Sequence, residues 1–255
     1  MNLTLVKYVL MAARRDKLMM TLLLMTVISV ASSMFLGSAA AVEEQQFAIV
    51  FGSGAIRFLG VMGIVLFTAF HMRRSFESKE VEFLLSRPIS RTSFLMSHAT
   101  AFMILALFVG IFMTVAQSFL GDMAWRHLLA WGYSISLEFA ITAIVTLFFA
   151  MVLSSAAGAA LASLGVYVLG RMSGTLLGIS DLPPQNIWDQ ILSYVMEIIS
   201  IFLPRLDMMG QSSWLVYGLD TEQVVHYARG ADAFSHKMIE ILGVLGFVTA
   251  QSVIF

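Results

Sequence analysis

The sequence predicts an all-α polytopic membrane protein with six transmembrane helices, and three observations lead to that fold class. First, 59% of the 255 residues are hydrophobic and only 12% are charged, whereas soluble domains have about 45–50% apolar and about 25% charged residues. Second, several apolar runs reach about 20 residues, which is the length that a helix needs to cross a hydrocarbon core of about 30 Å. Third, no stretch shows the alternating pattern of membrane β-strands.

Composition also limits the chemistry that we expect. The net charge is −1 and there is no cysteine, which disfavours a nucleic-acid partner and excludes disulfides, thiolate metal sites and cysteine nucleophiles. The chain has neither a Gly-x-x-x-x-Gly-Lys-Ser/Thr phosphate loop nor a His-Glu-x-x-His zinc motif. We therefore expect no catalytic residue, cofactor or metal on this chain.

The first 17 residues are too charged to span a membrane. A helix there would separate two kinds of side chain, with Leu3, Val6, Leu10 and Ala13 on one face and Thr4, Lys7 and Arg14 on the other. This pattern predicts an amphipathic elbow helix that lies in the membrane interface. The alternative is a cleaved secretory signal with small residues at 37–41, but the apolar run that precedes them exceeds the usual signal core and further spans follow.

Six apolar segments are predicted to be the spans. They cover residues 18–41, 47–72, 94–120, 128–153, 156–179 and 237–255. A longer, mixed segment covers residues 180–236, and within it residues 187–203 are apolar enough to be mistaken for a span. Because Asp189 and Glu197 interrupt that stretch, we interpret it as an interfacial or re-entrant helix.

Charge predicts the orientation of the chain. Lys and Arg concentrate in the cytoplasmic segments of membrane proteins. The N-terminal segment and the loop between spans two and three hold nine of them: Lys7, Arg14, Arg15, Lys17, Arg73, Arg74, Lys79, Arg87 and Arg91. Both termini and this loop are therefore predicted to be cytoplasmic, and residues 180–236 are predicted to lie outside.

The cytoplasmic loop has its own helical pattern. Residues 77–86 contain no Gly or Pro, Pro88 ends the pattern, and Ser90 or Thr92 can cap the next helix. Acidic and apolar side chains occur together in this stretch, which is typical of a helix that docks into a groove on another protein. The alternative is that the stretch rests on lipid headgroups.

Residues 77–91, with the sequence ESKEVEFLLSRPISR, resemble the cytoplasmic loop of ABC-2-type transporter permeases, which has an acidic start, a Leu-Leu pair, a Pro and an Arg that leads into the third span. Residues 203–207 also resemble a segment before the last span in permeases encoded beside nitrous-oxide reductase maturation genes. Elsewhere the resemblance is one of layout: an elbow helix, six spans and a long outer segment.

The resemblance implies the membrane-spanning permease subunit of an ABC exporter in a bacterial-type inner membrane. Residues 77–91 would form the coupling helix against a separate ABC ATPase subunit that holds ATP and Mg, and a second permease copy would complete a dimer. The residues implied in ATPase coupling are Glu77, Glu80, Val81, Glu82, Leu84, Leu85, Arg87 and Arg91.

Four charged residues fall within predicted spans: Arg57, Glu138, Arg171 and Glu240. Intramembrane charges are costly and default to functional hypotheses. We expect them in the outer half of the membrane, with Glu138 paired to Arg57 or Arg171, either as a salt bridge that locks spans or as a polar patch along a substrate path. Span four also carries a polar stripe that must face protein or water, made of Ser134, Glu138, Thr142 and Thr146.

Small residues recur on spans four and five at Ser154, Gly158 and Ala162, with Gly165 beyond, and they predict close helix packing in a hairpin or at a dimer contact. Two other functions stay open at this point. One is an intramembrane enzyme, most plausibly a peptidase that depends on Ser53 or Glu138. The other is a structural membrane subunit that does not transport.

Overall fold

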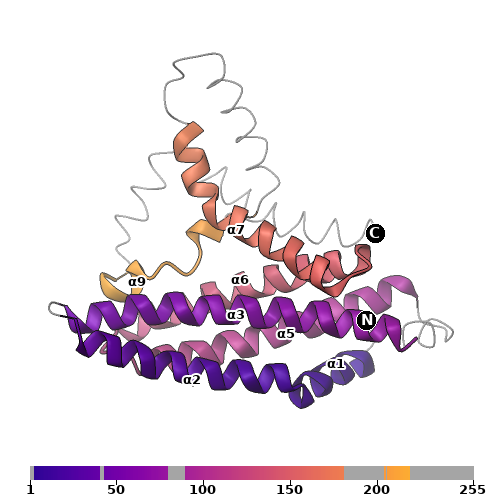
Figure 1. Ribbon diagram of the computed structural model, residues 1–255, viewed down its shortest axis with the longest axis horizontal. Coiled ribbons are helices and arrows are strands. Elements are labelled where there is room, and N and C mark those ends of the chain that lie inside the picture. The colour runs from indigo at the N-terminus through magenta and orange to yellow at the C-terminus, as the bar shows by residue number, and fades with distance from the viewer. Residues whose placement is uncertain (1–2, 41–42, 80–89, 181–203, 205, 219–255) are drawn as a thin grey trace.

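The computed structural model describes residues 3–40, 43–79, 90–180, 204 and 206–218, and among these it contains helices but no strand (Figure 1). The elements in chain order are α1 (Leu3–Arg15), α2 (Lys17–Ser38), α3 (Glu44–Glu77), α5 (Arg91–Gln117), α6 (Trp125–Val152), α7 (Ala156–Ser180), the short 3₁₀ helix η1 (Leu206–Met208) and α9 (Ser213–Val216).

Five of these helices, α2, α3, α5, α6 and α7, are long and apolar enough to cross a membrane. They coincide with the first five predicted spans, so the chain is an all-helical, multi-pass membrane protein. Large apolar side chains such as Phe58, Phe108 and Ile111 are more than half exposed on the outside of the bundle, as expected of surfaces that face lipid. The predicted sixth span, 237–255, lies outside the described residues.

Four of the long helices, α2, α3, α5 and α6, run side by side along the length of the molecule (Figure 1). Helix α3 lies at the centre of the bundle, because it packs against α2, α5, α6 and α7. The core between these helices includes the fully buried side chains of Ile56, Phe67, Met113, Trp131 and Phe139. Helix α7 starts beside the bundle and its later half leads away from it (Figure 1).

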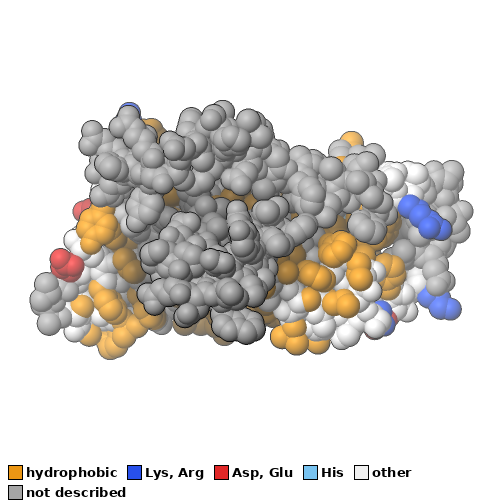
Figure 2. All heavy atoms as spheres, turned by 90° about the horizontal axis from the view of Figure 1, so that it is seen from above, with side chains coloured by type: hydrophobic (Ala, Val, Ile, Leu, Met, Phe, Trp, Pro, Cys, Tyr) orange, Lys and Arg blue, Asp and Glu red, His pale blue; other side chains and the backbone are white. Residues whose placement is uncertain are grey.

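Charge separates along the same axis. Basic side chains gather at one end of the face shown in Figure 2, acidic side chains lie at the other end, and hydrophobic side chains lie between. Arg73, Arg74 and Lys79 stand where α3 ends, and Glu43 and Glu44 stand where it begins. The two ends of the bundle therefore differ in charge, one basic and one acidic. Sequence predicted the same difference between the two sides of the membrane.

Helix α3 ends where the predicted coupling helix begins. Glu77 is the last residue of α3, Ser78 is its C-cap, and Lys79 has a left-handed φ of 58°. Because a left-handed residue interrupts a helix, residues 77–79 do not form the start of a separate helix. Residues 80–89 lie outside the described residues, so the coupling helix itself stays a prediction. Arg91 is the first residue of α5, which Ser90 caps by accepting a hydrogen bond from the Ser93 amide at 3.2 Å. Sequence offered Ser90 or Thr92 as the cap of this helix, and the structure shows that it is Ser90.

The N-terminal helix packs on protein. Its buried side chains are Leu5, Val6, Val9 and Ala13, and it contacts α5. The predicted apolar face is partly wrong, since Leu3 is exposed. Val6 and Ala13 are buried as predicted, Leu10 is partly buried against the core, and Leu5 and Val9 are buried in addition. A position of this helix in the membrane interface stays a prediction.

Glycine permits the close approach of α5 and α6. A Cβ atom built on Gly110 would overlap the Ser136 side chain and lie 2.9 Å from the Ser136 Cα, and one on Gly132 would overlap Thr114. The predicted small-residue stripe behaves differently, because a Cβ on Gly165 would meet nothing within 4 Å. The buried small residues described on α7 are instead Ala159, Ala160, Ser163, Gly170 and Ser173. A dimer contact at the predicted stripe stays a prediction.

The glycine contact between α5 and α6 can be tested by Gly110→Ala. The added methyl group meets backbone that cannot move aside, so we expect a loss of about 1–3 kcal/mol in the free energy of unfolding, measured as a lower midpoint of thermal unfolding in detergent. The matched control is Gly54→Ala, since a Cβ on Gly54 meets nothing within 4 Å. Equal midpoints for the two variants would contradict the proposed helix contact.

Candidate functional site

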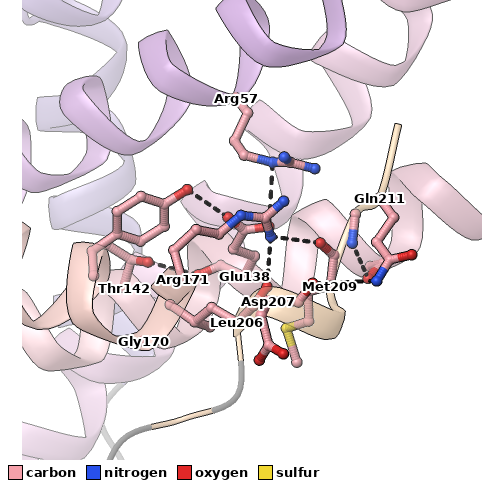
Figure 3. Close-up of polar contacts among 12 residues, drawn as sticks. Arg57, Glu138, Thr142, Gly170, Arg171, Leu206, Asp207, Met209 and Gln211 are labelled. Carbon is pink, nitrogen blue, oxygen red and sulfur yellow. Dashed lines mark hydrogen bonds and ion pairs between the residues drawn. The ribbon is translucent and has the colours of Figure 1, made fainter. Parts of the chain in front are cut away.

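Three charged side chains from three helices converge inside the bundle (Figure 3). Arg57 Nε of α3 lies 3.6 Å from Glu138 Oε2 of α6, and Arg171 Nη1 of α7 lies 3.8 Å from the same oxygen. The Glu138 side chain is 0% exposed. Sequence left open which arginine pairs with Glu138, and the structure places both beside it. Glu240, the fourth predicted intramembrane charge, lies outside the described residues.

The second carboxylate oxygen of Glu138 has a partner that sequence analysis missed. The Tyr167 hydroxyl donates to Glu138 Oε1 at 2.7 Å. One signal was available, because Tyr167 and Arg171 are four residues apart and such residues share one face of a helix. An arginine inside a span could therefore have pointed to the tyrosine one turn earlier as its companion.

The polar stripe of α6 faces protein, as predicted. Glu138, Thr142 and Thr146 are buried, and Ser134 is half-buried. Thr142 Oγ1 donates to the Glu138 carbonyl at 2.8 Å and Thr146 Oγ1 donates to the Thr142 carbonyl at 2.7 Å. Because both hydroxyl groups donate to backbone carbonyls of their own helix, their burial has only a small cost in free energy.

The segment that contains η1, residues 206–210, is anchored against the charged cluster. Arg171 Nη1 donates to the carbonyls of Leu206 and Met209, at 2.5 and 2.7 Å. The Gly210 amide donates to Ser134 Oγ at 2.9 Å, and Trp131 Nε1 donates to the Gly210 carbonyl at 3.1 Å. Side chains of α6 and α7 thus add to the few backbone hydrogen bonds of residues 206–210, such as that from the Met209 amide to the Leu206 carbonyl. Irregular backbone is tolerated among membrane helices where protein supplies such partners.

Glycines make room for this segment. A Cβ on Gly170 would lie 2.9 Å from the Pro204 carbonyl oxygen, and one on Gly174 would overlap the Asp207 carboxylate, which also accepts a hydrogen bond from Ser173 at 2.8 Å. Gly210 has a φ of +55°, and a Cβ there would lie 2.7 Å from Arg57 Nη2. Gly210 is therefore required both by its backbone conformation and by its contact with the arginine.

The cluster lies near the middle of two long helices. Glu138 is midway along α6 (Trp125–Val152) and Arg57 is slightly before the middle of α3 (Glu44–Glu77). The expected position in the outer half of the membrane stays a prediction. Near the middle of a membrane an unpaired charge is most expensive.

Few of the residues implied in ATPase coupling can be placed. Glu80, Val81, Glu82, Leu84, Leu85 and Arg87 lie outside the described residues. Glu77 pairs with Arg73 on the same helix, with Oε1 of Glu77 2.9 Å from Nε of Arg73, and Arg91 is exposed. At the same end Asp16 accepts a hydrogen bond from the Leu18 amide at 2.9 Å and lies 3.6 Å from Arg74 Nη1. The junction of α1 and α2 is thus tied to the end of α3.

The described residues contain no group of three or more His, Cys, Asp or Glu side chains that could hold a metal. Ser53, a residue of the enzyme hypothesis, is buried and donates to the Val50 carbonyl on its own helix at 2.9 Å. Its hydroxyl proton is directed at backbone rather than at a side-chain base.

The chain matches no protein-family model, no curated protein and no solved structure. The family resemblance of residues 77–91 and 203–207 therefore stays a prediction from sequence. The geometry on its own shows a buried cluster of Arg57, Glu138, Tyr167 and Arg171 that holds the 206–210 segment in place.

The anchoring of that segment can be measured by removing one hydrogen bond. Trp131→Phe keeps a ring in the core but leaves the buried Gly210 carbonyl without its donor, a loss of about 1–3 kcal/mol. The chain has no cysteine, so Leu215→Cys, at a buried position of α9, provides a single reporter. We expect Trp131→Phe to raise the rate of maleimide labelling at that cysteine about tenfold.

The control for this measurement is Trp125→Phe, because Trp125 lies on the same helix and is 66% exposed. It should leave the labelling rate unchanged. If the two tryptophan variants label at the same rate, Trp131 does not hold the segment.

Proposed function

We propose that this chain is the membrane-spanning permease subunit of an ABC-2-type exporter, with ATP hydrolysed on a separate ABC ATPase subunit. One observation carries the proposal. Helices α3 and α5 both reach the basic end of the bundle, and the residues that join them there have the acidic, apolar and Pro-Ile-Ser-Arg pattern of an ATPase-docking loop. Such a loop suits a groove on a partner protein.

The helix that leads into this loop also supports the proposal. Helix α3 is continuous from Glu44 to Glu77, so the loop and Arg57 stand at two points of one rod. At 1.5 Å per residue they are about 30 Å apart. A displacement of the loop by ATPase closure would therefore be carried along α3 to the buried cluster.

The N-terminal helix strengthens the same end. It packs on α5, and the Arg74–Asp16 pair joins its junction with α2 to α3. Exposed ion pairs contribute only about 0–1 kcal/mol, so the apolar contact with α5 holds the helix and the ion pair orients it. Helix α1, helix α3 and the loop that follows α3 would then move as one unit.

This function sets the location and partners of the chain. We propose a bacterial-type inner membrane with both termini and the 78–90 connection in the cytoplasm, and a second permease copy as the other half of the transporter. The chain itself contributes a path and a lever, and the chemistry of ATP and Mg belongs to the ATPase.

The class of protein is tested by purification of the chain from its native membranes in mild detergent. We expect a P-loop ATPase to co-purify, and we expect Leu84→Asp with Leu85→Asp to abolish that association, because charge replaces the apolar docking face. Phe119→Asp is the control, since Phe119 is exposed and follows the end of α5 (Arg91–Gln117) that is opposite to the loop. A chain that purifies without any ATPase would overturn the proposal.

Coupling is tested by charge reversal. Glu80→Lys with Glu82→Lys should leave membrane insertion intact and separate ATP hydrolysis from transport, measured as ATPase activity that no longer responds to cargo in reconstituted vesicles. The control is Glu43→Lys with Glu44→Lys, which reverses the same charge at the other end of α3. Unchanged coupling in the loop variant would count against the lever.

The orientation is tested with single cysteines in this cysteine-free chain. Ser78→Cys and Glu44→Cys are both at exposed positions, at opposite ends of α3. In intact cells a membrane-impermeant maleimide should label the cysteine at 44 and leave the one at 78 unlabelled until the membrane is opened. The reverse pattern would place the basic end outside.

A further inference from the structure

Arg57 is a buried cation with unused hydrogen-bond donors. Its side chain is 12% exposed, and its Nε and Nη2 atoms are buried without a hydrogen-bond acceptor among the described residues. The Arg57–Glu138 distance of 3.6 Å exceeds the range of about 2.7–3.2 Å for an N–H···O bond. A guanidinium has five N–H donors. Arg57 therefore has donors that the oxygen atoms of a ligand could accept.

The contrast with Arg171 shows that Arg57 is the exceptional residue. Arg171 donates to two backbone carbonyls and lies beside the same carboxylate. Glu138 Oε1 accepts from Tyr167, whereas Oε2 lies 3.6 Å from Arg57 and 3.8 Å from Arg171 and has no hydrogen bond among the described residues. Among these three ionisable side chains one positive charge is in excess, and a lock between helices would need only one arginine.

We propose that the cluster of Arg57, Glu138 and Arg171 binds the oxyanion headgroup of an amphiphilic cargo, a phosphate ester, with the Arg57 guanidinium as the main ligand. That this ligand is cargo rests on the proposed transport function. A planar guanidinium matches two phosphate oxygens in a bidentate pair. An anion there would neutralise the excess charge where charge is most costly.

Residue 210 borders the Arg57 guanidinium. A Cβ on Gly210 would lie 2.7 Å from Arg57 Nη2, so an oxyanion can reach this nitrogen from the Gly210 side only if the 206–210 segment shifts. The cluster lies midway along α6, where the headgroup of a molecule crossing the membrane is farthest from water. Glu138 holds the two arginines together when the site is empty and competes with the anion when it is filled.

Substitutions of Arg57 and of Glu138 should therefore change the affinity for the anion in opposite directions. Arg57→Gln removes the main ligand and should weaken anion binding about tenfold, as expected for loss of a charged hydrogen-bond pair. Glu138→Gln removes the competing carboxylate and should strengthen binding severalfold. A purely structural cluster predicts no such opposite effects.

The experiment uses the full chain, purified in a neutral detergent without any ATPase. Binding is titrated by native mass spectrometry with short-chain phosphatidylglycerol, with diacylglycerol of the same chain length, and with inorganic phosphate as competitor. Arg126→Gln is the matched control, because Arg126 is an exposed arginine on α6 that lies over the Trp125 ring. If Arg57→Gln fails to fold, Arg57→Lys replaces it in the experiment. Lysine keeps the charge and loses the planar fork, so we expect an affinity between those of the unmodified chain and a chain without the charge.

Each result decides a point. Tighter binding of phosphatidylglycerol than diacylglycerol, weakened by Arg57→Gln and not by Arg126→Gln, supports the site. Competition by phosphate at equal concentration identifies a free anion as the ligand, and failure to compete identifies the lipid-linked headgroup. Equal binding of both lipids, or equal affinity in the Arg57 and Glu138 variants and the unmodified chain, overturns the site. Because no ATPase is present, this outcome is independent of whether an ATPase co-purifies.

Discussion

A carboxylate at 0% exposure in the middle of a membrane helix is the constraint on which the rest of this structure depends. Glu138 needs compensation that lipid does not supply, and it receives it from Arg57 on α3 and from Arg171 and Tyr167 on α7. Meeting that need brings α3, α6 and α7 together at one depth. It also turns Arg171 toward the carbonyls of Leu206 and Met209, so the same charges that pair the helices hold the irregular segment against them.

Close packing makes this arrangement possible. Gly110 and Gly132 bring α5 against α6, and Gly170 and Gly174 open a surface on α7 that receives Pro204, Leu206 and Asp207. The rods that carry the cluster are long, and α3 joins it directly to the basic end of the bundle. A rigid rod with a polar contact midway and a protein-docking pattern at its end is an arrangement in which force applied outside the membrane can reach a buried site.

Much of this could be predicted from residue patterns. Apolar runs located α2, α3, α5, α6 and α7, because a span requires a minimum length of apolar chain. The hydroxyl and carboxyl groups of α6 at four-residue spacing indicated a protein-facing stripe. The charges within spans indicated a pairing, and Ser90 indicated a helix start. Each of these features depends on a single helix or loop. The order of the residues along the chain is therefore enough to predict it.

Other features required the tertiary structure. Whether Arg57 or Arg171 pairs with Glu138, and that both do, depends on how three helices rotate against one another. Sequence could not predict that the carbonyls of Leu206, Met209 and Gly210 accept these hydrogen bonds, since every residue carries a backbone carbonyl. The extension of α3 to Glu77, and the burial of Leu5 and Val9 on α1, follow from neighbouring helices. Sequence alone determined that charges lie within a membrane-spanning bundle, whereas only the packing of the helices decided which donors they share and which they leave unused.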